Sequence, residues 1–354
     1  MTRTPAALSS IARVASLDPP GEESYVRVVR RFSLIVSVCL VLLCAIAPNR
    51  AEQPDAEFQD WVAALRDEAL SRKISPQTLD LALADLEFLE RVVELDRNQP
   101  EFTLTFDEYL DRIINDRRVS TGKQKLREHR ALLEELRDRY GVQPRFIVAL
   151  WGIESDFGRR TGSFSVIDSL ATLAYDGRRG AFFRRELLDA LTILDEGHIE
   201  RSRMLGSWSG AMGQPQFMPS SFRRFAVDHD GDARRDIWGS VPDALASAAN
   251  YLSGSGWRGD LIWGREVRLP GDLDASLVGR GRGRPIAQWQ ELGVRRHDGS
   301  DLPSASLEGA IVRPDGDSGP AYLVYDNYAA LLRWNRSDFF ATTVGLLSDR
   351  IAGR

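Results

Sequence analysis

The chain has 354 residues, of which 43% are hydrophobic and 27% charged, and its formal net charge is −5. This composition excludes an intrinsically disordered chain, a collagen-like repeat and a polytopic membrane protein. Residues 1–50 carry a net charge of +3 and the rest of the chain carries −8. Because nucleic-acid binding relies on cations that neutralise phosphates, the acidic body excludes a general nucleic-acid-binding protein.

Residues 1–50 have the pattern of an export signal. An apolar run over residues 32–48 follows three arginines, contains both cysteines of the chain and ends with small residues at Ala45 and Ala47. The run is shorter than the about 20 apolar residues that a membrane-spanning helix needs, so we expect a cleaved signal peptide and a periplasmic protein. An inner-membrane anchor formed by residues 32–48 is the alternative. The two Cys and four His disfavour metal sites built on thiolates or imidazoles.

Residues 51–354 are expected to form one domain of the α+β class that is predominantly α-helical. Helical spacing of apolar residues predicts a helical lobe over about 56–140, in which 123–140 is one charged helix ended by Gly141. Pro144 opens the expected core, about 141–255. Gly, Pro and short β-prone pieces predict a small β-containing lobe over about 256–322, and a C-terminal helix is expected over about 323–352.

Glu154 is the first candidate for catalysis. It follows a run of apolar residues that begins at Phe146. Burial there would disfavour the ionised carboxylate and raise the pKa of Glu154, which would keep a proton available near neutral pH. General acid catalysis at a glycosidic oxygen needs such a group. A capping or salt-bridged surface glutamate is the alternative.

Residues 206–221 form the second candidate. Three Gly and two Pro interrupt regular helix, while Trp208, Phe217, two Met and two Gln are concentrated there. Apolar faces for sugar rings and amides for sugar hydroxyl groups are what a saccharide cleft requires. A well-packed core loop with methionine as a gap-filler is the alternative.

The third candidate is an acidic loop with Asp228, Asp230, Asp232 and Asp236. Acidic oxygens at alternate positions around a glycine are similar to the start of a calcium loop. The glycine falls at the fourth position instead of the sixth, and Gly239 occupies the twelfth position, where an EF-hand needs a glutamate. Asp243 would have to close the shell, and a solvated turn held by aspartates is the alternative.

Three segments taken together resemble the membrane-bound lytic murein transglycosylase B family. They are Glu154-Ser155-x-Phe157-Gly158, Gly210-Ala211-Met212-Gly213-x-x-Gln216-Phe217-Met218-Pro219-Ser220, and the ending Tyr322-x-Val324-Tyr325-Asp326-Asn327-Tyr328…Arg333-Trp334-Asn335-Arg336-Ser337-Asp338. The resemblance implies a lysozyme-like core and a lyase that cleaves peptidoglycan between N-acetylmuramic acid and N-acetylglucosamine. In that reaction Glu154 would be the sole acid and base, and the muramic 6-hydroxyl would close onto C1 to leave a 1,6-anhydro end. No cofactor is required.

The resemblance also assigns further site residues. Residues that match the family's glycan cleft are Ser207, Gln216, Tyr251, Asn335, Trp334 and Tyr109. Trp334 stands where some members have Tyr, which preserves a stacking surface. The Asp228–Asp236 loop matches the place where some members bind structural Ca²⁺. We expect a monomer that binds the glycan strands of peptidoglycan. The sequence does not identify a partner in the cell-wall synthesis or secretion machinery.

Two other functions remain open. One is a hydrolytic muramidase on the same fold, which would need a second carboxylate about 6.5–9.5 Å across the cleft from Glu154, with room for a water. The other is a catalytically silent scaffold that binds peptidoglycan through the same aromatic cleft.

Overall fold

The computed structural model describes residues 56–98 and 104–353, so the predicted export segment with Cys39 and Cys44 lies outside the described residues. The helices are α2 Ala56–Ser71, α3 Pro76–Leu83, α4 Glu90–Arg97, α5 Phe106–Ile113, α6 Asp116–Glu128, α7 Arg130–Tyr140, α8 Pro144–Ser155, α9 Val166–Asp176, α10 Gly180–Asp195, α11 Pro219–Phe225, α12 Val241–Gly254, α13 Ile286–Glu291, α14 Asp326–Trp334 and α15 Asp338–Ala352. The strands are β1 Phe164–Ser165, β2 Leu205–Gly206, β3 Gly264–Arg268, β4 Arg284–Pro285, β5 Arg295–Arg296, β6 Glu308–Val312 and β7 Ala321–Val324.

Helix ends are set by short local signals. Thr105 and Glu108 form a capping box at the start of α5, in which each side chain accepts the backbone N–H of the other residue. Pro144 occupies the first turn of α8, where its missing N–H costs nothing. Helix α7 ends at Gly141, which adopts φ 71°, a left-handed conformation that glycine reaches without strain.

The expected single helix over 123–140 is wrong. The structure has two helices, α6 and α7, which meet at His129. The His129 ring packs against Trp151 on α8, with ring centroids 5.4 Å apart. After this turn α7 packs against α12, whereas α6 packs against α8 and α15. The tertiary packing therefore interrupts a charge pattern that would suit one continuous helix.

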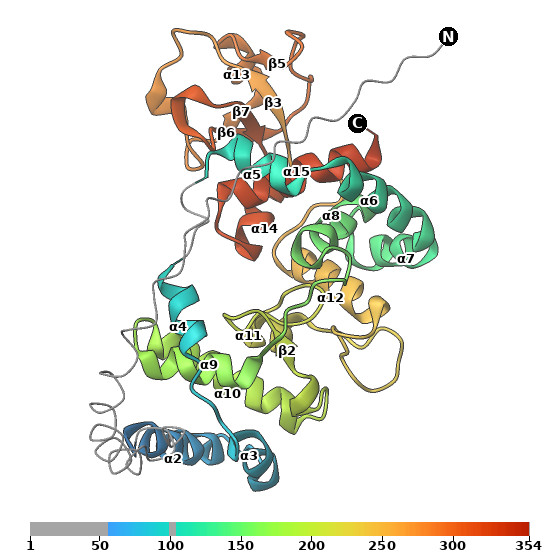
Figure 1. Ribbon diagram of the computed structural model, residues 1–354. Coiled ribbons are helices and arrows are strands. Elements are labelled where there is room, and N and C mark those ends of the chain that lie inside the picture. The colour runs from blue at the N-terminus through green and yellow to red at the C-terminus, as the bar shows by residue number, and fades with distance from the viewer. Residues whose placement is uncertain (1–55, 99–103, 354) are drawn as a thin grey trace, which may run out of the picture. The chain divides into compact units, whose positions relative to one another are not determined.

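The helices bury two large hydrophobic clusters. The first cluster joins α2, α3, α9 and α10 with Met212 and Phe217. The second cluster joins α5, α7, α8, α12, α14 and α15. Figure 1 shows α9 and α10 side by side, in agreement with their extensive contact. Trp334, at the end of α14, packs against both clusters, so it lies where the two meet.

The predicted β-containing lobe is an antiparallel sheet with the strand order β4-β6-β7-β3-β5 (Figure 1). Its own small cluster includes Trp289 of α13, Ile311 of β6 and Leu323 of β7. Residues 323 and 324 belong to this sheet, and Asn335 to Ser337 separate α14 from α15. The single C-terminal helix expected over 323–352 is therefore wrong.

The predicted fold class is confirmed, because the described residues are mostly helical and add a small five-stranded antiparallel sheet and the two-stranded pair β1-β2. Among residues 56–98 and 104–353, none of the helices has the length and apolar character needed to cross a membrane.

Gly345 offers a test of the packing between α15 and the sheet lobe. A Cβ at this position would lie 2.2 Å from the buried indole ring of Trp263, whose Nε1 donates to Asp349 Oδ2 at 2.9 Å. Gly345→Ala gains up to about 1 kcal/mol of helix propensity. Overpacking costs about 1–3 kcal/mol and should outweigh this gain, because the Trp263 ring is fully buried and its Nε1 is fixed by Asp349. We expect a lower free energy of unfolding by urea.

Gly271→Ala is the control for Gly345→Ala, since a Cβ at Gly271 meets nothing within 4 Å. Equal stability of both variants would contradict this packing.

Candidate active site

Helix α8 places Glu154. Every residue from Arg145 to Gly152 on this helix is buried, so the helix runs through the second cluster with Glu154 near its last turn. Gly152 is required there, because a Cβ would lie 2.8 Å from the ring of Phe157, which folds back over the helix. Asp156 ends the helix in the left-handed region, with φ 51°. The Glu154 side chain is half-buried. This position matches the sequence prediction of a carboxyl group at the end of an apolar helix.

Glu154 is oriented by an aromatic side chain. Trp334 Nε1 donates a hydrogen bond to Glu154 Oε1 at 2.7 Å. The Trp334 ring packs against Tyr251, with centroids 4.7 Å apart, and against Phe217, at 5.3 Å. Tyr251 comes from α12 and Phe217 from the loop before α11, so two separate segments support the indole at the end of α14. An indole N–H can only donate, so Oε1 of Glu154 is held as an acceptor.

Tyr251 helps to hold Trp334 in place. Its side chain is buried, and its hydroxyl donates to the backbone carbonyl of Arg333 at 2.6 Å. Burial raises the pKa of the Tyr251 phenol above its ordinary value. The sequence prediction gave Tyr251 a role in the glycan cleft, and the structure shows its hydroxyl directed at α14, the helix that ends in Trp334.

The loop over residues 206–218 contains both a packed core and a polar side. Met212 is fully buried and forms isolated β-bridges with Gly206 and Phe217. Ser207 Oγ accepts from the backbone N–H of Ala211 at 3.1 Å. Gln216 Nε2 donates to the carbonyls of Thr161, at 3.0 Å, and Gly213, at 2.8 Å. Ser207 and Gln216 are half-buried, so both remain partly open to a ligand.

Gln214 was missed by the sequence analysis. It is buried, its Oε1 accepts from Trp151 Nε1 at 2.9 Å, and its Nε2 donates to the carbonyl of Trp238 at 3.2 Å. It therefore ties the loop before α11 to α8, one turn before Glu154. The sequence shows only two glutamines in one loop, and nothing in it distinguishes the buried one from the half-buried Gln216.

Asp156 is not available as a second catalytic carboxylate. It is buried and forms ion pairs with Arg117 at 3.1 Å and Arg159 at 3.0 Å. Burial alone would raise the pKa of Asp156, but the hydrogen bonds from the two arginines outweigh it and hold the pKa below its ordinary value. The side chain therefore serves to close the end of α8.

Two of the predicted cleft residues have other contacts. Asn335 is exposed, and its Oδ1 accepts from the backbone N–H of Ser337, in the turn between α14 and α15. Tyr109, on α5, is half-buried and packs against Phe339, with centroids 5.7 Å apart. The structure thus brings Trp334 and Tyr251 together beside Glu154, and it places Tyr109 in a different group of aromatic side chains.

The acidic loop is built around Asp243. This buried side chain accepts the backbone N–H groups of His229, Asp230 and Asp236. Its pKa is raised, because burial outweighs these hydrogen bonds. One carboxylate oxygen from each of Asp228, Asp230 and Asp232 lies within 4.8 Å of the others. Asp236 lies outside this group, and its Oδ1 instead accepts from the backbone N–H groups of Trp238 and Gly239.

Comparisons of the sequence with known proteins agree in matching it to lytic transglycosylases. A family model described as the transglycosylase SLT domain matches residues 57–349. Over 251 residues the chain is 30% identical to the membrane-bound lytic murein transglycosylase B of Escherichia coli (strain K12). The aligned region covers 69% of this chain and 66% of that protein. The chain therefore spans slightly less than two thirds of the length of this curated relative.

Solved structures are similar over most of the chain. SltB3 from Pseudomonas aeruginosa, in complex with NAG-anhNAM-pentapeptide, is 46% identical with a TM-score of 0.81, covering 84% of this chain and 80% of that one. The soluble lytic transglycosylase SltB1 of the same organism is 31% identical with a TM-score of 0.73, over 83% and 98% of the two chains. The Escherichia coli lytic transglycosylase Slt35, in complex with calcium, is 26% identical with a TM-score of 0.71, over 86% and 94%.

Proposed function

Because this chain belongs to the family of lytic transglycosylases that carry the transglycosylase SLT domain, we propose that it cleaves the glycan strands of peptidoglycan without consuming water. The observation that carries this proposal is the carboxyl group of Glu154, which Trp334 orients at the end of α8. The complexes of SltB3 with NAG-anhNAM-pentapeptide and NAG-NAM-pentapeptide support peptidoglycan as the substrate.

In the proposed reaction Glu154 acts twice. As an acid it gives its proton to the oxygen between N-acetylmuramic acid and N-acetylglucosamine, and the bond from that oxygen to C1 breaks. As a base it then takes the proton of the muramic 6-hydroxyl, whose oxygen bonds to C1 and closes the 1,6-anhydro ring. The hydrogen bond from Trp334 Nε1 to Oε1 orients the carboxyl group for both proton transfers. Glu154 ends the cycle protonated again.

A hydrolytic muramidase is the competing reaction. It would need a second carboxylate to activate water, and the nearest one along the chain, Asp156, is neutralised by Arg117 and Arg159. Mass spectrometry of digested peptidoglycan separates the two reactions. Products that end in 1,6-anhydromuramic acid support the proposal, whereas reducing muramic ends alone would overturn it. A silent binding scaffold would release neither product.

The proposed place of action is the periplasm, where peptidoglycan lies. The basic and apolar pattern of residues 1–50 supports export to that compartment. The exported protein is then either cleaved after the apolar run or anchored in the inner membrane by residues 32–48.

We also propose that the acidic loop binds one Ca²⁺ in a structural role. The carboxylates of Asp228, Asp230 and Asp232 converge, and hard oxygen donors are what Ca²⁺ prefers. Three carboxylates are fewer than the six to eight oxygens of a full shell, so carbonyls and waters must complete it and the affinity should be modest. The calcium complex of Slt35 supports this assignment.

Calcium should therefore stabilise the folded chain. We expect millimolar CaCl₂ to raise the melting temperature by about 2–4 °C over the value in chelator, because an ion that binds only the folded state adds its binding free energy. The same concentration of MgCl₂ is the control for ionic strength. Asp230→Asn should remove most of the shift. A melting temperature that is the same in calcium and in chelator would contradict a bound ion.

A further inference from the structure

A pocket of about 360 Å³ lies between α3, the end of α10 and the acidic loop, outside the contacts that orient Glu154. Its lining residues are Thr78, Leu81, Ala82, Leu194, Gly197, His198, Ile199, Glu200, Arg201, Arg203, Arg234 and Asp236. This volume lies within the range of about 300–1,000 Å³ that small-ligand sites occupy.

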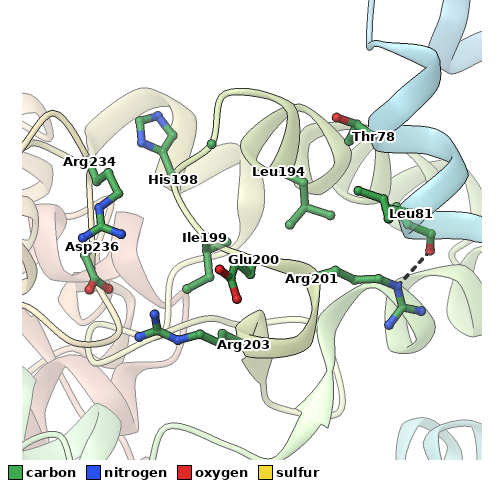
Figure 2. A pocket seen from close by; sticks show the side chains of 12 residues that line it. Thr78, Leu81, Leu194, His198, Ile199, Glu200, Arg201, Arg203, Arg234 and Asp236 are labelled. Atoms are coloured by element: carbon green, nitrogen blue, oxygen red, sulfur yellow. Dashed lines mark hydrogen bonds between the residues drawn. The ribbon is translucent and has the colours of Figure 1, made fainter.

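The walls of the pocket are fixed by hydrogen bonds. Arg201 donates to the carbonyl of Ala82 at 3.0 Å, the dashed line in Figure 2. It also donates to both oxygens of Asp168, which ties α3 to α9. On the other side, the buried ring of His198 accepts the backbone N–H of Arg235 through Nδ1 at 3.2 Å. The pocket is therefore preformed, and a ligand would spend little free energy on ordering its walls.

Two charged side chains of the pocket are not used by these contacts. Among the described residues, neither Glu200 nor Arg203 makes an ion pair with another side chain, and both are exposed. In Figure 2 the guanidinium groups of Arg203 and Arg234 extend toward the side where Asp236 lies. Glu200 lies between that side and the apolar side formed by Leu81 and Leu194. Leu81 is 75% exposed, so its apolar surface forms part of the rim.

This combination selects a class of ligand. A simple anion would be repelled by Glu200 and a simple cation by Arg203, whereas Arg234 is already paired with Asp232 at 3.0 Å. A ligand that carries a carboxylate and an ammonium group on a short aliphatic frame satisfies both charged groups and the leucines. The peptide stems of peptidoglycan have this chemistry, since they combine free carboxylates, the amino group of a diamino acid and the methyl groups of alanine.

The pocket is also within reach of a stem. Arg203 lies four residues before Ser207, and strand β2 connects them. Four residues span at most about 14 Å, and a five-residue stem spans about 17 Å when extended. A stem on a sugar bound near Ser207 can therefore reach Arg203.

We propose that this pocket binds the peptide stem of the glycan strand, with Arg203 on a stem carboxylate and Glu200 on its amino group. This inference rests on the proposed function, since it needs peptidoglycan as the substrate. The pocket would make the enzyme prefer strands that carry stems over strands from which they have been removed.

The test compares intact strands with the same strands stripped of their stems by an amidase. We expect Arg203→Glu and Glu200→Gln to lower the ratio of kcat/KM for intact over stripped strands about tenfold. Arg127→Glu is the control, because Arg127 is an exposed arginine of α6 without an ion pair among the described residues. The control should keep the wild-type ratio. Unchanged ratios in both pocket variants would overturn the proposal.

A binding measurement separates this proposal from the proposed function. Calorimetric titration of the Glu154→Gln protein with an N-acetylated stem pentapeptide requires no catalysis. We expect saturable binding that Arg203→Glu abolishes, and no binding in either protein would overturn the pocket. If the wild-type enzyme cleaves neither strand, the proposed function fails, whatever the titration shows. If it cleaves both while the titration and the ratio are negative, only the pocket proposal fails.

Discussion

Glu154→Gln is expected to lower the rate of peptidoglycan cleavage by about 10³-fold, because general acid and base catalysis contributes about 10²–10⁴-fold and this residue would serve in both roles. The amide is nearly the same size as the carboxyl group, and its oxygen can still accept from Trp334 Nε1. The loss should therefore appear in kcat, with KM and the melting temperature close to the wild-type values. The release of soluble anhydromuropeptides from purified peptidoglycan measures it.

The control for this substitution is Glu134→Gln. Glu134 lies on the exposed surface of α7 and forms an ion pair with Arg130 one turn away. Such a surface pair contributes only about 0.3–0.5 kcal/mol, so activity and stability should both stay near the wild-type values. If Glu154→Gln were as active as Glu134→Gln, the silent scaffold would become the better account of the site and Glu154 would have no catalytic role.

Local signals were sufficient to predict most of the helices. Periodic apolar residues and the boundaries at Pro144 and Gly141 predict elements that the structure contains. The errors occur at His129 and at Asn335, where the chain changes direction without glycine or proline. At both positions the helix ends because the next segment packs against a different neighbour, and a sequence window holds no information about that neighbour.

The site residues also divide into those that a local sequence pattern predicts and those whose contacts depend on the fold. Glu154 is recognisable from the apolar run that precedes it on the same helix. Its hydrogen bond to Trp334 spans 180 residues of sequence, and the bond between Trp151 and Gln214 spans 63. Asp243 gives a further example. Its spacing from the acidic loop makes it a candidate calcium ligand, whereas in the structure both of its carboxylate oxygens accept backbone N–H groups of that loop. Sequence reasoning finds the reactive group, and the long-range contacts that orient it require the fold.

The orientation of Glu154 by Trp334 can be measured directly. Trp334→Phe removes the indole N–H while leaving an aromatic ring between Tyr251 and Phe217. A hydrogen bond to a charged group is worth about 1.5–3 kcal/mol, and each 1.36 kcal/mol corresponds to about a tenfold change in rate. We therefore expect kcat to fall by about 10- to 100-fold with little change in KM, because the substitution keeps an aromatic ring at this position.

Two further variants show whether this loss comes from the hydrogen bond or from packing. Trp61→Phe makes the same change in the first cluster, where Trp61 stacks on Phe58 far along the chain from Glu154. It should reduce stability slightly and leave kcat unchanged. Trp334→Tyr restores a donor on an aromatic ring and should recover part of the lost kcat. If Trp334→Phe retained the wild-type kcat, the indole would serve only as a packing surface, and Glu154 would have to be oriented by other contacts.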